Sequence, residues 1–147
     1  MLQTSANYHQ PNLFSNDMMN QLDLQDPLIA LSHEINWKDL ELELSKYYTH
    51  NNGRPGKPIR LMAGLIILKQ LENLSDESIV TQWKRNPYYQ YFCGFKEFQS
   101  AEPCHATELV KFRKRIGKDG FEKIFSLSVN LHGKKAEEKS VIVDTTV

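Results

Sequence analysis

A nearly uninterrupted apolar run, LMAGLIIL at residues 61–68, constrains the fold of this chain more than any other feature. Residues 59–73 are apolar nearly all round, and this pattern predicts a helix that other elements surround. Gly64, inside the run, would let a neighbouring element approach closely. The run is much shorter than the roughly 20 residues of a membrane-spanning helix, so we expect it to form the centre of a globular domain.

Amphipathic helices predicted on both sides of the run can cover it, so the expected fold class is mainly α. With 147 residues, of which 40% are hydrophobic, the chain can bury a modest core in one domain. The ends of these helices are marked by cap residues, by prolines in first turns and by glycines after last turns. These signals predict a helix or helix pair from Pro27 to about Tyr48, and helices from Asp76 to about Arg85, from Pro87 to Gly94, from a cap at Thr107 to Gly117, and from Phe121 to His132.

The two helices that flank Leu74 are joined by so short a turn that they could form a helix-turn-helix, although many helical bundles contain such pairs. The segment before them, HNNGRPGKP at residues 50–58, is a loop because its glycines and prolines cannot continue a helix. By default it is a solvated connector. Three cations in and just after this loop, Arg54, Lys57 and Arg60, could nevertheless touch a DNA phosphate backbone.

The aromatic segment NPYYQYFCGF at residues 86–95 is expected to build core. In the alternative interpretation, one of Tyr88, Tyr89 or Tyr91 stacks on an exposed base.

Charge is distributed unevenly along this neutral chain. Up to His50, two lysines face seven acidic residues, which gives this part a net charge of −5 and leaves +5 for the rest. The densest cationic stretch is KFRKRIGK, residues 111–118. A basic cluster on a neutral protein indicates a local site for a polyanion, with a solvated helix face as the alternative.

The helix that contains this stretch has two different faces. At about 100° per residue, Leu109, Phe112 and Ile116 share one face and point to the core. The opposite face carries the cations Lys111, Lys114, Arg115 and Lys118. Arg113 lies on the flank, where its guanidinium could pair with a carboxylate or clamp a phosphate. We predict that these five residues contact double-stranded DNA.

Cysteine content and the start of the chain indicate a cytoplasmic protein. Cys93 and Cys104 are expected to be reduced, buried thiols. A zinc site that combines them with His105 and His132 is disfavoured, because the spacing matches no common zinc motif. The first ten residues, MLQTSANYHQ, lack the cationic patch of a signal peptide, and no membrane partner is expected.

The chain divides by composition into four parts. Residues 1–25 are expected to be a mobile arm, and residues 26–133 a helical DNA-binding domain. Residues 134–139 form a polar linker. In residues 140–147, SVIVDTTV, the stretch from Val141 to Val143 is apolar on both faces, as in a strand in the middle of a sheet, and we expect the first strand of a second domain.

Several blocks resemble, in order, the N-terminal part of bacterial insertion-sequence transposases, in the group named for insertion sequence 5. These blocks are KPIRLMAGLIILKQLENLSDESIV, NPYYQYFCGF, ELVKFRKRIGKDGFEKIF and VIVDTTV. The resemblance covers residues 59–147 well and residues 26–58 loosely. It implies a helical DNA-binding domain followed by a ribonuclease-H-like catalytic domain with an Asp-Asp-Glu triad.

In this resemblance Asp144 is the first carboxylate of the triad and, in a completed enzyme, a ligand of Mg²⁺. The family chemistry uses two divalent ions, which carboxylates on a rigid frame hold at the DNA phosphodiester. The other two carboxylates would lie beyond Val147. The expectation is therefore a transposase fragment that binds the terminal inverted repeats of its element, contains no cofactor and is catalytically inactive alone.

Two other functions remain open at this point. The chain could be a free-standing regulator that occupies the element ends and inhibits transposition. It could also be a helical protein-interaction module without a role in nucleic-acid binding. The expected partner is double-stranded DNA at the element ends, and a second copy of the chain or the missing catalytic half could bind in addition.

Overall fold

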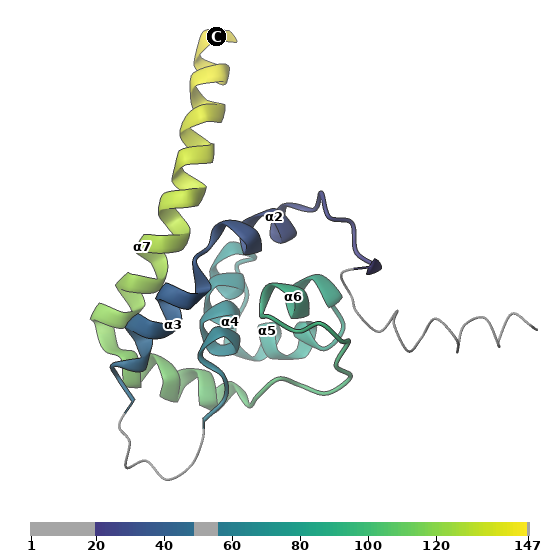
Figure 1. The fold of residues 1–147 in the computed structure, drawn as a ribbon, viewed down its shortest axis with the longest axis vertical. Coiled ribbons are helices and arrows are strands. Elements are labelled where there is room, and N and C mark those ends of the chain that lie inside the picture. Colours follow the sequence, from purple (N-terminus) through teal and green to yellow (C-terminus); the bar gives the residue numbers. More distant parts are fainter. Residues whose placement is uncertain (1–19, 49–55, 147) are drawn as a thin grey trace, which may run out of the picture.

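The computed structural model describes residues 20–48 and 56–146, with side chains as far as Leu127. Across these residues the fold is helical and contains no strand (Figure 1). The helices are α2 (Pro27–Glu34), α3 (Trp37–Ser45), α4 (Ile59–Leu71), α5 (Asp76–Trp83), α6 (Pro87–Phe92) and α7 (Ala106–Thr146). The predicted mainly α class is confirmed for this part of the chain.

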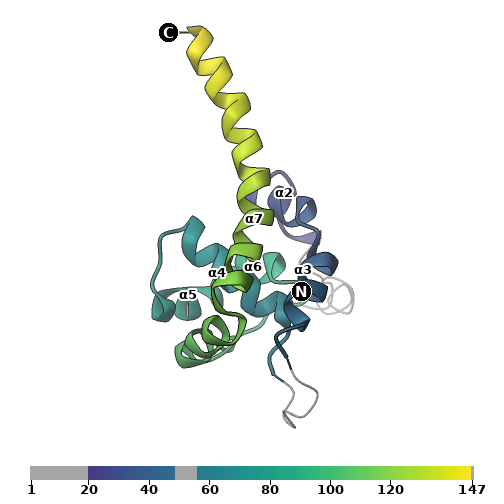
Figure 2. The same cartoon turned by 90° about the vertical axis from the view of Figure 1, so that its left-hand side faces the viewer.

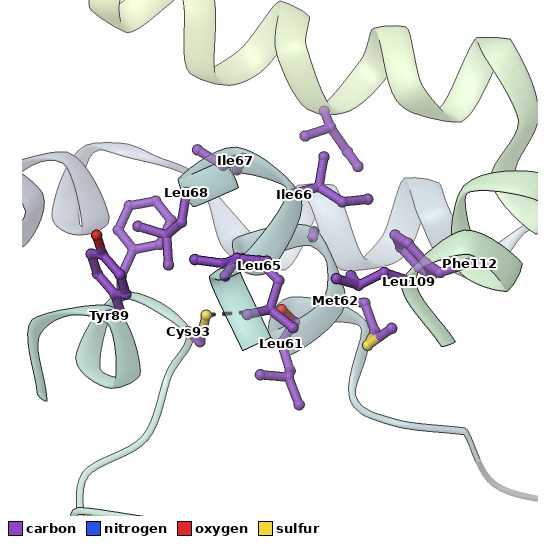
Figure 3. Packing of buried hydrophobic residues seen from close by; sticks show 14 of the residues in the cluster. Leu61, Met62, Leu65, Ile66, Ile67, Leu68, Tyr89, Cys93, Leu109 and Phe112 are labelled. Carbon is purple, nitrogen blue, oxygen red and sulfur yellow. Dashed lines mark hydrogen bonds between the residues drawn. The ribbon is translucent and has the colours of Figure 1, made fainter. Parts of the chain in front are cut away.

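Helix α4 forms the centre of the core, as its apolar run predicts (Figure 3). Every residue from Leu61 to Leu68 is buried, and α4 packs against α3, α5 and α7. A Cβ placed on Gly64 would lie only 2.7 Å from the Sγ of Cys93. The Cys93 thiol donates a hydrogen bond to the Leu61 carbonyl oxygen at 3.8 Å, drawn as a dashed line in Figure 3. The close approach predicted at Gly64 is therefore confirmed, and its partner is the residue that follows α6.

Side-chain caps set the start of the short helices. The Asp26 carboxylate accepts a hydrogen bond from the Leu28 N–H at 2.9 Å and starts α2 before Pro27, as predicted. Asn36 then caps α3, so the region up to Tyr48 is a helix pair. In α5 the Ser75 hydroxyl oxygen accepts from the Ser78 N–H, which confirms the predicted start at Asp76.

Helix α7 is bent at Gly117, where φ is 65° and ψ is −169°. The helix begins at Ala106, so Thr107 lies within the first turn and is not the cap as predicted. Glu108 reaches back instead, and its carboxylate accepts a hydrogen bond from the His105 N–H at 2.9 Å. Gly117 absorbs the bend because glycine adopts positive φ without steric cost. The helix resumes directly after it, before the start predicted at Phe121.

The linker predicted at residues 134–139 and the strand predicted at 140–147 are wrong as far as residue 146, because these residues continue α7 (Figures 1 and 2). A strand must pair its backbone N–H and C=O groups with another strand, and the described residues offer none. A helix satisfies these groups within the segment. Asp144 consequently lies in the last turn of α7, which extends away from the other helices in both views.

Only the end of the predicted N-terminal arm falls within the described residues. Residues 20–25 form turns that lead into α2, and the Asp23 N–H donates a hydrogen bond to the Tyr88 hydroxyl at 3.1 Å. Residues 1–19 lie outside the described part. Although α7 is long, neither it nor any other described helix has a stretch apolar and long enough to cross a membrane.

Candidate nucleic-acid interface

Four cations project from the part of α7 that surrounds its bend. Lys111, Lys114, Arg115 and Lys118 are exposed, and we call them the basic face. The residues predicted to point the other way, Leu109, Phe112 and Ile116, are 0%, 4% and 1% exposed and belong to the core. The amphipathic pattern read from the sequence is therefore confirmed.

No member of the basic face forms an ion pair with another described residue. The nearest preceding acid in the helix is Glu108, whose carboxylate is already bonded to the His105 N–H. The next acid in the sequence is the exposed Asp119, which directly follows Lys118 but forms no ion pair with it. The positive charge of the four side chains is thus available to an external anion.

Arg115 is held by an aromatic ring from another helix. Its guanidinium lies over the Tyr48 ring, with the Cζ atom 4.6 Å from the ring centroid. Tyr48 comes just after α3 and is half-buried, and burial raises the pKa of its phenol while Arg115 opposes the rise. The stacking orders one cation of the basic face against the body of the protein. Nothing in the sequence spacing indicated this contact.

Arg113 takes the carboxylate-pairing role that the sequence left as one of its two alternatives. Its Nη1 and Nη2 donate to Oδ1 and Oδ2 of Asp76 at 2.8 and 2.7 Å. The Nζ of Lys69 lies 3.8 Å from the same carboxylate. Chiefly through the hydrogen bond from Arg113, the pKa of Asp76 is held below its ordinary value. Arg113 therefore joins α7 to the first turn of α5, with its two bonded nitrogens directed at protein.

The three cations predicted around the loop differ in their surroundings. Arg54 lies outside the described residues. Lys57 is exposed, and its charge acts on the Cys104 thiol, which places it near the segment that leads into α7. Arg60 is half-buried, with its Cζ 4.5 Å from the Trp37 ring centroid and its Nη2 donating to the Phe92 carbonyl oxygen at 3.3 Å. The structure therefore places Arg60 in a pocket between helices and not with the loop surface.

Helices α4 and α5 have the short connection expected of a helix-turn-helix. The first turn of α5 carries two acids, Asp76 and Glu77. Asp76 is bonded to Arg113, and Glu77 is exposed. An exposed acid at the start of a helix opposes close approach to phosphates. The basic face of α7 is the better candidate surface for a polyanion.

The tyrosines of the aromatic segment all bond within the protein. The buried Tyr89 donates from its hydroxyl to the Glu72 carboxylate at 3.0 Å, and burial raises its pKa to about 12. Tyr88 accepts from the Asp23 N–H, and the Tyr91 hydroxyl lies 3.3 Å from Nε2 of His33. Tyr89, Phe92 and Cys93 of this segment belong to the core, as expected, and Tyr91 stays partly exposed at a cavity wall.

The described side chains form no candidate metal site, and the two cysteines are not joined by a disulfide. No three His, Cys, Asp or Glu residues among the described residues come together to hold a metal ion. The side chain of Asp144 lies outside the described side chains. Cys93 and Cys104 are free and buried, and burial raises their pKa values to about 12 and about 11. The predicted reduced, buried thiols are confirmed.

Comparisons with known proteins found a curated relative and a family that match this chain. The chain is 38% identical over 141 residues to an uncharacterised protein, ORF8 in the nfe locus, of Rhizobium meliloti. The alignment covers 92% of this chain and 68% of that protein. No solved structure matches the chain. The family described as "Transposase domain (DUF772)" matches residues 16–115. Since this match spans more than half of its length, the chain belongs to the DUF772 transposase domain family.

Proposed function

We propose that this chain is the DNA-binding part of an insertion-sequence transposase of the insertion sequence 5 group, and that it binds the terminal inverted repeats of its element. The observation that carries the proposal is the basic face of α7, four exposed cations without an ion-pair partner among the described residues. Three of them, Lys111, Lys114 and Arg115, lie within the residues that match the transposase domain family. Double-stranded DNA is the partner because its regularly spaced phosphates suit several cations on one helix.

The arrangement around the basic face supports a rigid contact. Arg113 and Asp76 fix the first segment of α7 against α5, and Tyr48 orders the guanidinium of Arg115. Side chains that are ordered before binding lose less conformational entropy when they meet a phosphate. In this proposal Arg113 positions the helix, and Lys57 extends the cationic surface toward the start of α7.

Asp144 enters the proposal only as part of a larger catalytic assembly. The resemblance to the insertion-sequence transposases makes it the first carboxylate of a triad that holds Mg²⁺. The described residues do not fit a two-ion site, because they bring no cluster of metal-ligating side chains together. We therefore assign DNA binding to this chain and derive no step of strand transfer from it.

Transposition requires that the two element ends be brought together for strand transfer, so the proposal includes assembly with a second copy of the chain or with a catalytic part. The cytoplasm is the compartment in which we expect this assembly to occur.

The proposal is tested with fluorescently labelled duplexes that carry an element end or a scrambled sequence. Changing Lys111, Lys114, Arg115 and Lys118 together to alanine is expected to weaken binding to both duplexes by at least roughly a hundredfold, since phosphate contacts dominate affinity. The matched control changes four exposed cations elsewhere, Lys38, Lys46, Arg85 and Lys123, to alanine. It removes the same charge and is expected to bind nearly as the unchanged chain. Equal losses in the two variants would refute a localised interface.

A further inference from the structure

A cavity that shares no lining residue with the basic face contains two further cations, Arg60 and Lys96. The cavity, of about 420 Å³, opens where the end of α2, the start of α3, the first turn of α4 and the segment after α6 meet. Its walls include Trp37, Arg60, Tyr91, Phe95 and Lys96. The volume falls in the range of roughly 300–1,000 Å³ that is typical of small-molecule sites.

Arg60 is clamped in the wall of this cavity. Its guanidinium stacks on Trp37 at 4.5 Å, and on another side a Cβ placed on Gly94 would lie 2.9 Å from the Arg60 Cδ. Gly94 has a φ of 94°, so the position suits glycine for two reasons. The arginine is thus fixed by its neighbours and cannot swing freely into solvent.

The hydrogen-bonding capacity of Arg60 exceeds what the described residues use. Its Nη2 donates to the Phe92 carbonyl oxygen at 3.3 Å, while its buried Nε has no hydrogen-bond partner among them. Glu41 acts on the guanidinium electrostatically, but no described carboxylate forms an ion pair with it. A guanidinium keeps its charge even when partly buried, and a charge in such a place is stabilised by an anion.

The other polar groups of the cavity are also suited to an anion. Lys96 is exposed at the wall, and the same cavity is lined by Tyr91 and His33, whose hydroxyl oxygen and Nε2 lie 3.3 Å apart. Among the described residues that line the cavity, none carries a carboxylate. Aromatic rings of Tyr91 and Phe95 complete the walls and offer apolar surface to a planar ring.

We propose that this cavity binds one phosphate-bearing nucleotide, with Arg60 and Lys96 at the phosphate and the aromatic walls at the base. The cavity is larger than a bare phosphate needs, and base stacking on aromatic side chains is a common contribution to nucleotide binding. The nucleotide comes either from solution or from an unpaired position at the end of a DNA strand. The site shares no residue with the basic face, so the inference does not depend on the proposed duplex binding.

The test is calorimetric titration of the full chain with dAMP, deoxyadenosine and inorganic phosphate. dAMP is expected to bind more tightly than either of its parts. Changing Lys96 to glutamate is expected to weaken dAMP binding by roughly tenfold or more, because a charge-assisted hydrogen bond is lost and repulsion is added. The matched control, Lys38→Glu, reverses an exposed lysine on α3 outside the cavity and is expected to leave the affinity unchanged.

Arg60→Gln is expected to abolish dAMP binding, and thermal unfolding of each variant shows whether it has kept its fold. Should Arg60→Gln unfold, Lys96→Glu alone decides the matter. The proposal is overturned if dAMP does not bind at millimolar concentration, if deoxyadenosine binds as tightly, or if Lys96→Glu binds dAMP unchanged. The fourfold alanine variant of the basic face is expected to bind dAMP normally, so a failure of duplex binding is separable from a failure of the cavity.

A short 5′-phosphorylated single strand distinguishes the two sources of the nucleotide. Displacement of dAMP by this strand supports the cavity as a site for a DNA end. Persistence of dAMP in its presence supports the cavity as a site for a free nucleotide.

Discussion

The guanidinium of Arg113 in α7 donates two hydrogen bonds, of 2.8 and 2.7 Å, to the carboxylate of Asp76 in α5. The side chains are only 28% and 17% exposed, so solvent screens the pair incompletely. Because Arg113 lies among the cations of the basic face in sequence, the same short segment both anchors α7 and presents charge to solvent. The orientation of the proposed DNA surface therefore depends on this ion pair.

Replacing Arg113 with methionine is expected to lower the free energy of unfolding by about 1–3 kcal/mol, because the Asp76 carboxylate loses its principal partner. Lys69, at 3.8 Å, compensates only in part. Urea denaturation measures the change, and Lys111→Met, at an exposed position of the same helix, is the control with an expected effect below about 0.5 kcal/mol. In a variant that carries both Arg113→Met and Asp76→Asn, the loss of unfolding free energy should be smaller than the sum of the losses in the two single variants. Strict additivity would mean that the pair contributes nothing.

Acid is expected to remove the contribution of the same pair. The pKa of Asp76 is lowered in the folded protein, mainly by the hydrogen bond from Arg113. A depressed carboxyl pKa contributes stability above its unfolded value of about 3.9, and this contribution is lost as pH falls through the lower folded value. The stability difference between the unchanged chain and Asp76→Asn should therefore be constant from about pH 7 to 5 and shrink below about pH 4. A difference that stays constant down to pH 2.5 would contradict the assignment.

The contact between α4 and the residue after α6 predicts an unusual pair of effects. Gly64→Ala should destabilise the protein by about 1–2 kcal/mol, since overpacking against the Cys93 Sγ at 2.7 Å outweighs the better helix propensity of alanine. In a Cys93→Ala background the clash is gone, and Gly64→Ala should become neutral or stabilising. Thermal unfolding of the unchanged chain, the two single variants and the double variant measures both effects. Equal effects of Gly64→Ala in both backgrounds would show that Cys93 is not its neighbour.

The bend in α7 depends on one backbone conformation. Gly117 has a φ of 65° and a ψ of −169°, a region that alanine adopts only with strain of about 1–3 kcal/mol. A Cβ at this position would meet nothing within 4 Å, so Gly117→Ala is expected to destabilise through the backbone and not through a clash. Chemical denaturation tests this beside Glu122→Ala, an exposed position after the bend. An increase in stability for Gly117→Ala would indicate a straight helix in solution.

Local sequence signals predicted much of the helical body correctly. The apolar run at residues 61–68, the caps at Asp26 and Ser75, and the core face of Leu109, Phe112 and Ile116 all follow from periodicity and short-range hydrogen bonding. These features depend on residues within one helix or its cap, at most seven positions apart in the sequence. Pattern reasoning is strongest at that range.

The wrong strand prediction at residues 140–147 and the contacts that the sequence did not predict depend on interactions between segments that are far apart in the chain. Val141, Ile142 and Val143 favour a strand by composition, yet the described residues offer no second strand to pair with them, and they continue α7. The pairing of Arg113 with Asp76 spans 37 positions, and the stacking of Arg60 on Trp37 joins two helices. No spacing rule for one helix predicts such contacts.

The salt dependence of binding to an element-end duplex tests the central claim most directly. Affinity is measured by fluorescence anisotropy between about 50 and 300 mM salt, because each phosphate contact contributes a slope of roughly −0.9 to the logarithmic plot. The unchanged chain should lose affinity steeply, and alanine at Lys111, Lys114, Arg115 and Lys118 should flatten the slope by about 3 to 4. A slope that is the same in both proteins would show that the basic face does not contact DNA.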